Sequence, residues 1–121
     1  MKTNPEIGYE SMIINHMNGN LFAMHFAYTD INPYKVLRII SENTLEIQEM
    51  KHEADPNDRP EFVPGGFSAI CVKSGSRLIT EDPNGRILRI RRTKRDPDRW
   101  TYKGMRFRLG YKPSAYYDYN F

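Results

Sequence analysis

Apolar and arginine positions alternate in Ile87-Leu88-Arg89-Ile90-Arg91-Arg92, and they alternate again in Met105-Arg106-Phe107-Arg108-Leu109. Because the side chains of a strand point to opposite faces in turn, each run predicts a strand with one apolar face and one arginine face. A turn sequence, Asp82-Pro83-Asn84-Gly85, precedes the first run, and we expect its glycine to supply a positive φ. A polar loop at 93–99 separates the runs, which together predict a β-hairpin.

Further strand patterns lie before this hairpin. Residues 21–28 form an apolar run typical of a buried strand, 36–40 and 44–52 predict a hairpin, and so do 67–72 and 77–80. Residues 55–66 hold three prolines and two glycines, which predict a mobile surface loop. Six or seven short strands at regular spacing indicate an all-β, mainly antiparallel fold, either a small barrel or a sandwich.

The first nineteen residues favour a short helix. Asn4 is a suitable N-cap, Pro5 suits the first helical position, and the apolar positions that follow have helical spacing. We predict a helix over 5–17, with a strand over 11–14 as its competitor because Gly8 weakens the helix. The chain then divides into a helical extension, 1–19, and a β region, 20–121, within one domain.

The C-terminal residues alternate in a way that allows two interpretations. Tyr117, Tyr119 and Phe121 would share one face of a last strand and close the core. Alternatively, exposed tyrosines beside arginines would form a stacking platform for single-stranded nucleic acid. The sequence leaves both open.

Composition restricts the setting. The single cysteine, Cys71, forms no internal disulfide and has the spacing of a small buried strand residue. The N-terminus lacks an apolar run of signal-peptide length, and no eighteen apolar residues follow one another. We therefore expect a soluble cytoplasmic protein with no membrane partner.

Charge is divided unevenly along the chain. Residues 1–85 carry seven Lys/Arg and twelve Asp/Glu, whereas 86–121 carry eleven and three, so segments of net charge −5 and +8 give the total of +3. Such a division gives one surface a strong potential unless the fold interleaves the two segments. The basic segment is therefore the stronger candidate for contact with an anionic partner.

The arginine face is the candidate binding surface. We expect the arginines of the two runs to lie near one another, and like charges in register destabilise a strand pair unless a ligand neutralises them. Eight of the eleven basic residues are arginine, which forks onto phosphate and stacks on bases. A solvated sheet face is the simpler explanation. The predicted contacts to nucleic acid or another polyanion, such as an acidic protein surface, are Arg89, Arg91, Arg92, Arg106, Arg108, Trp100 and Tyr102.

An enzymatic role is the weaker prediction. His25 or His52, paired with Asp30 or Glu53, could act as a base in RNA cleavage, with Arg89 or Arg106 holding the phosphate. The three histidines lack metal-ligand spacing, and the chain has no phosphate-binding glycine loop. We expect a non-enzymatic protein with neither a cofactor nor a metal ion.

A row of carboxylates supports a competing class. Glu46, Glu49, Glu53, Asp55 and Asp58 place five acidic side chains within thirteen residues. Such a row could imitate phosphates and block the nucleic-acid channel of a host defence protein. The commoner explanation is a solvated hairpin edge, and a third possibility is a structural protein that self-associates through strand edges.

Several short motifs together resemble small uncharacterised proteins of bacteriophages and prophages. This chain has Ile31 and Asn32 where that pattern has arginine and histidine, so no role of that histidine is carried over. The resemblance implies a compact β fold, a phage or mobile-element origin and a bacterial host cytoplasm, and it brings no established activity. The residues that carry it are Tyr28-Thr29-Asp30, Pro33, Val36, the segment 43–54 with Gln48, Asp82-Pro83-Asn84-Gly85, Trp100, Leu109-Gly110, Tyr116, Asp118 and Phe121.

Overall fold

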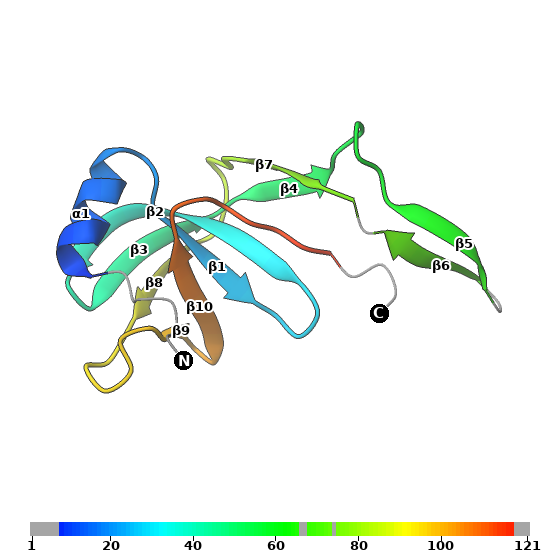
Figure 1. Ribbon diagram of the computed structural model, residues 1–121. Helices are drawn as coiled ribbons and strands as arrows, with labels where there is room; N and C mark the ends of the chain where they lie inside the picture. Colours follow the sequence, from blue (N-terminus) through cyan, green and yellow to red (C-terminus); the bar gives the residue numbers. More distant parts are fainter. Residues whose placement is uncertain (1–7, 66–67, 74, 118–121) are drawn as a thin grey trace, which may run out of the picture.

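Six antiparallel strands close into a barrel in the order β1-β10-β9-β8-β3-β2, as Figure 1 shows. The structure is a computed structural model, and it describes residues 8–65, 68–73 and 75–117. The barrel strands are β1 (Phe22–Phe26), β2 (Ile31–Ser41), β3 (Thr44–Glu49), β8 (Ile87–Arg91), β9 (Trp100–Tyr102) and β10 (Met105–Gly110). The predicted all-β small barrel is confirmed.

The barrel is made of two three-strand meanders. β1, β2 and β3 pair in chain order, and so do β8, β9 and β10. The pairs β3–β8 and β1–β10 join the two meanders on either side. The predicted hairpin between 36–40 and 44–52 is present as the β2–β3 pair, but its second strand ends at Glu49, and residues 51–52 belong to the arm instead.

An arm at 51–80 is inserted between β3 and β8. β4 (Lys51–Ala54) pairs with β7 (Arg77–Thr80), and β5 (Glu61–Gly65) pairs with β6 (Ser68–Lys73). Figure 1 shows the arm extending away from the barrel, with β5 and β6 at its far end. The predicted hairpin of 67–72 with 77–80 is therefore wrong, and part of the predicted 55–66 loop is strand β5. Cys71 lies on β6, and its side chain is outside the described part of the chain.

Gly75 explains why the chain does not fold back between β6 and β7. Its φ is +76°, and a Cβ there would lie 2.3 Å from the carbonyl oxygen of Asp58. The amide of Ser76 donates to the same carbonyl at 3.1 Å. The backbone at 75–76 therefore packs against residue 58, and β7 continues onto β4.

The barrel interior is filled by the apolar positions that alternation predicts. Leu88 and Ile90 of β8 and Phe107 of β10 are buried, whereas the arginines between them are exposed. The fully buried side chains with the largest volumes include Trp100, Tyr34, Leu45 and Ile47. The core thus contains the aromatic residue that the sequence analysis assigned to the binding surface.

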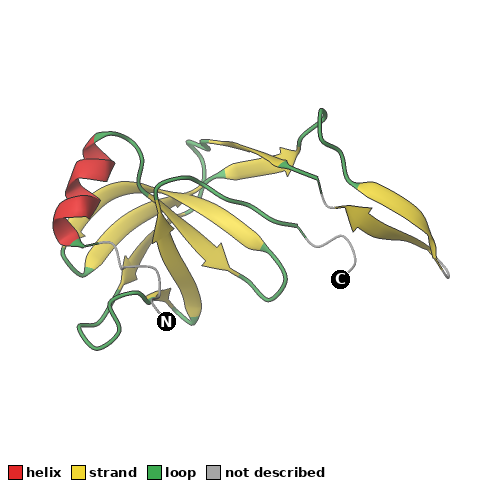
Figure 2. Ribbon diagram, viewed as in Figure 1, coloured by secondary structure: helices red, strands yellow, loops and turns green. Residues whose placement is uncertain are grey.

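Helix α1 (Tyr9–Met17) contributes to this core from the end of the barrel opposite the arm, as Figure 2 shows. Met12 is its one buried residue and belongs to the core cluster. Gly19, with φ +73°, follows the helix, and its amide donates to the carbonyl of His16. The helix is confirmed over 9–17, while Asn4 and Pro5 are outside the described residues.

Strand β2 begins earlier than predicted because Pro33 is tolerated inside it. The carbonyl of Pro33 accepts a hydrogen bond from the amide of Met50. Because the N–H and C=O of one strand residue point to the same side, the position of the missing N–H also faces Met50 and not β1. On that side the ladder with β3 ends at the pair Tyr34–Glu49. The proline therefore removes no bond from the β2–β3 ladder.

The turn at 82–85 forms as predicted, but its glycine has another role. The amide of Gly85 donates to the carbonyl of Asp82 at 2.9 Å, and the amide of Asn84 donates to Oδ1 of Asp82 at 3.0 Å. Gly85 is not among the glycines with positive φ. A Cβ at this position would lie 2.1 Å from the carbonyl oxygen of Glu49, so glycine is needed for a close backbone approach.

The C-terminal segment adds a single bridge to the barrel. The backbone of Tyr116 exchanges two hydrogen bonds of 3.0 Å with Ile31. Tyr117 is 45% exposed, so it does not close the core. Tyr119 and Phe121 are outside the described residues.

Candidate functional site

The arginines of the two runs share the outer surface of the barrel, but strand β9 separates them. Arg91 is the register partner of Thr101, and Thr101 is also the partner of Arg106. The expected hairpin between the two arginine runs is wrong. Trp100–Tyr102 forms a strand of its own, β9, and β9 forms a hairpin with β10 through the turn residues Lys103 and Gly104. The arginines are two strands apart, so direct cross-strand repulsion does not apply to them.

On the β8 side of this surface the fold interleaves the acidic and basic segments. Glu46 of β3 lies opposite Arg89 of β8, with Oε2 to Nε at 3.6 Å. The same oxygen lies 3.4 Å from Nη2 of Arg38. These are exposed ion pairs of the kind worth about 0–1 kcal/mol, but they give Arg89 a carboxylate partner.

On the β10 side no such neutralisation occurs. Arg106 and Arg108 are exposed on β10, whose other neighbour is β1. The outer face of β1 carries Phe22, Met24 and Phe26, which are apolar. Within the described part of the chain, neither guanidinium makes an ion pair. Arg108 makes a cation–π contact with Phe26, with Cζ 5.9 Å from the ring centroid.

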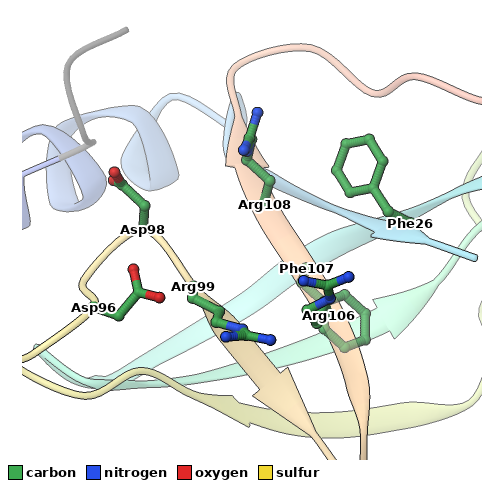
Figure 3. A pocket seen from close by; sticks show the side chains of 7 residues that line it. All are labelled: Phe26, Asp96, Asp98, Arg99, Arg106, Phe107 and Arg108. Carbon is green, nitrogen blue, oxygen red and sulfur yellow. The ribbon is translucent and has the colours of Figure 1, made fainter. Parts of the chain in front are cut away.

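These two arginines line a groove of about 400 Å³. The 93–99 loop forms its opposite wall and adds a third arginine, Arg99. Figure 3 shows Arg99 and Arg106 directed toward the middle of the groove, with the ring of Phe26 at one side and the carboxylates of the loop at the other. The lining residues are Phe26, Asp96, Asp98, Arg99, Arg106, Phe107 and Arg108.

Three of the predicted contact residues do not belong to this surface. Trp100 is 1% exposed and lies in the core, and Tyr102 packs against the same core cluster. Arg92 is 8% exposed, with its guanidinium 4.8 Å from the Trp100 ring centroid. Its Nε donates to the carbonyl of Glu42 at 3.1 Å, and its Nη1 donates to the carbonyl of Pro97 at 3.3 Å. Trp100 and Arg92 are buried and cannot contact a surface ligand, whereas Tyr102 is half-buried, with one side of its ring against the core.

The groove residues that the sequence analysis missed are Phe26 and Arg99, with Asp96 and Asp98. Phe26 was assigned to a buried run, yet it is 46% exposed at the end of β1. Alternation places Phe26 on the same outer face of β1 as Met24, and this pattern could have indicated from the sequence that Phe26 faces outward. Arg99 lies in a loop, where no periodicity indicates direction.

His52 occupies a structural position at the base of the arm, on β4. Nε of Arg77 donates to Nδ1 of His52 at 3.1 Å, so the ring proton is on Nε2, which lies 3.2 Å from Oδ1 of Asn32. Burial and the charge of Arg77 lower the pKa of His52, against weaker opposing effects of Asp30 and Glu49. His52 is therefore a neutral link between the arm and β2.

His25 lies at the inner face of β1, with its ring centroid 5.3 Å from that of Phe107. Burial and the charge of Arg86 lower the pKa of His25, and Glu49 opposes them. Burial also raises the pKa of the neighbouring Tyr34, whose hydroxyl accepts a hydrogen bond from Nη2 of Arg86 at 3.5 Å. His25 and Tyr34 are on β1 and β2, and both rings contact Phe107 of β10 inside the barrel.

The predicted carboxylate row is only partly available. Glu46 is engaged by two arginines, and Asp58 accepts a short hydrogen bond from the hydroxyl of Ser76. Across residues 8–65, 68–73 and 75–117, no three His, Cys, Asp or Glu side chains come together as metal ligands. Of the helical segments described, none has both the length and the apolar character needed to span a membrane.

Comparisons with known proteins found no matching family model, no matching curated protein and no matching solved structure. The function is therefore argued from the site itself.

Proposed function

We propose that this protein is a non-enzymatic binding protein that holds nucleic acid, or another polyanion, on the outer face of β8, β9 and β10. The contact residues are Arg106 and Arg108 with Arg99 from the loop, and Arg91 extends the surface across Thr101. Arg89 has a lesser role because Glu46 already neutralises it. A phage-encoded accessory protein acting in a bacterial cell fits this proposal.

One observation carries the proposal. Three arginines line one open groove, and none of the three makes an ion pair within the described part of the chain. Guanidinium groups bind phosphate through two parallel hydrogen bonds, and an arginine without a carboxylate partner gives up no ion pair to do so. A solvated face would gain nothing from bringing three arginines to one hollow.

Fluorescence anisotropy with labelled DNA and RNA, single-stranded and duplex, tests this proposal between about 50 and 200 mM salt, where phosphate contacts weaken steeply. We expect the double variant Arg106→Glu with Arg108→Glu to abolish binding. Replacing both residues by alanine should lower the slope of log affinity against log salt by about 1 to 2.

A matched control keeps the change in net charge equal. Lys51→Glu with Arg59→Glu reverses two exposed charges on the arm, away from the groove. If the groove is the binding surface, this variant binds nearly as well as the wild type. Equal loss in both variants would show that only the net charge matters, and the proposal would fail.

The competing proposal, an inhibitor that binds a host protein through its carboxylates, has less support because Glu46 is engaged in ion pairs. Glu46→Lys with Glu49→Lys separates the two proposals. Nucleic-acid binding should persist or increase in this variant, whereas a partner held by the acidic row would be lost. Absence of nucleic-acid binding by the wild type at low salt would redirect the search to a protein partner.

A further inference from the structure

We infer that the groove binds a single strand of nucleic acid, with a base stacked on Phe26 and the adjoining phosphates on Arg106 and Arg108. This inference rests on the proposed function and names its substrate class. It comes from three features of the groove: an exposed aromatic ring at one wall, a pair of arginines on β10 and two carboxylates at the other wall.

The aromatic wall is Phe26. Its side chain is 46% exposed on the outer face of β1, beside buried Phe22 and Met24 of the same face. An exposed phenyl ring next to guanidinium groups is the arrangement on which unpaired bases stack, and every base offers a flat face for it. The bases of a duplex are already stacked on one another and do not present that face.

The arginines have the spacing that a single strand requires. Arg106 and Arg108 are two residues apart on one strand, so their Cα atoms are about 6.8 Å apart along β10. That separation is comparable to one nucleotide step of an extended strand. Arg108 approaches Phe26 at 5.9 Å and has no other recorded partner in the described chain, so its guanidinium is free to leave the ring for a phosphate while a base takes the ring.

The acidic wall limits the groove to one strand. Asp96 and Asp98 lie on the loop opposite Phe26, and neither carboxylate makes an ion pair in the described part of the chain. A duplex carries a second row of phosphates, which these carboxylates would repel. The volume of about 400 Å³ also falls near the lower end of the range of roughly 300–1,000 Å³ that holds one small-molecule-sized group.

The experiment compares four labelled probes of equal length by fluorescence anisotropy at one salt concentration. They are an oligothymidine strand, the same backbone with abasic sites, and a DNA duplex, and an oligouridine strand is included to distinguish DNA from RNA. We expect the wild type to bind the oligothymidine or oligouridine strand more tightly than the other two probes. Phe26→Ala should weaken binding to the base-bearing strand by roughly 5- to 150-fold and leave binding to the abasic strand unchanged.

Two further variants control for indirect effects. Ile14→Ala removes a side chain that is 58% exposed on α1 and is not among the groove residues, so it should alter no affinity. Asp96→Asn with Asp98→Asn should reduce the preference for the single strand by raising affinity for the duplex.

The outcomes separate the two proposals. If Phe26→Ala has no effect, or weakens the abasic and base-bearing strands equally, stacking on Phe26 is refuted. If the duplex binds as tightly as the single strand, the substrate class is refuted. In both cases the proposed function stands provided that the arginine variants still abolish binding. If the wild type binds no probe at low salt, the proposed function fails as well.

Discussion

Removing the guanidinium of Arg92 should destabilise the fold strongly, because this arginine connects three segments from a buried position. Its Nε donates to the carbonyl of Glu42 at 3.1 Å and lies 3.3 Å from Oδ1 of Asn43, while Nη1 donates to the carbonyl of Pro97. Its charge also lies over the ring of Trp100. Arg92→Ala therefore removes the link between the β2–β3 turn and the loop before β9.

The magnitude follows from these contacts. Two charge-assisted hydrogen bonds contribute about 1.5–3 kcal/mol each, and a cation–π contact adds roughly 0.5–1 kcal/mol. Glu42 is exposed and Pro97 is half-buried, so their carbonyls regain water in the variant, and the lower end of the range applies. We expect a loss of about 3 kcal/mol in the free energy of unfolding, or a fall of roughly 9–15 °C in Tm.

Urea unfolding followed by tryptophan fluorescence measures this loss. Trp100 is the single tryptophan of the chain and is 1% exposed, so its emission reports on the core. The guanidinium of Arg92 lies 4.8 Å from the indole ring centroid, so its removal can change the tryptophan emission of the folded protein directly. Far-ultraviolet circular dichroism is therefore the second probe, because it follows the backbone and not the indole.

Arg91→Ala is the matched control. Arg91 is the adjacent residue, is exposed and has no side-chain partner recorded in the described chain. Its loss should change stability by no more than about 0.5 kcal/mol. Arg92→Lys keeps the charge but not the planar fork, and an intermediate loss is expected. The reasoning would be refuted if Arg92→Ala and Arg91→Ala had equal effects.

Two further predictions concern the junction of the arm and the barrel. The pKa of His52 is lowered in the folded state, so the unfolded state binds more protons once the pH falls below about 6.5. The contribution of His52 to stability is therefore lost as the pH falls from 7 to 5. Tm should therefore fall less over this window in His52→Gln than in the wild type, and an equal fall would contradict the assignment. A Cβ at Gly85 would lie 2.1 Å from the carbonyl oxygen of Glu49, so Gly85→Ala should cost about 1–3 kcal/mol in urea unfolding. Gly8→Ala is the control: a Cβ there meets nothing within 4 Å, so the variant should cost less, under about 1 kcal/mol for the change of helix N-cap.

Alternation was the signal that allowed the barrel to be predicted. Leu45 and Ile47 alternate with polar residues, and so do Leu88 and Ile90, and all four point inward. Period two fixes the face of a residue from its immediate neighbours alone. This is why the faces of β3, β8 and β10 were correct while the partners of β6 and β7 were not, since pairing depends on contacts between distant segments.

The error at Trp100 has a physical cause as well. Trp100, Thr101 and Tyr102 alternate, which indicates two aromatic side chains on one buried face, but three residues are too few to stand out from the polar loop before them. An aromatic residue beside arginines was therefore interpreted as a ligand contact. The structure uses the same pairing internally, with Arg92 over the Trp100 ring.

The position of each arginine in the strand order, rather than the number of arginines, decides which are available to a partner. The basic meander β8–β9–β10 has one edge against β3, whose Glu46 neutralises Arg89, and the other edge against β1, whose outer face is apolar. Closing the barrel through the β1–β10 pair therefore places Arg106 and Arg108 beside an exposed phenyl ring instead of a carboxylate. The charge asymmetry of the sequence is cancelled on one side of the meander and retained on the other. We propose that the polyanion surface is centred on the β10 side for this reason, and the variants of Arg106 and Arg108 test it.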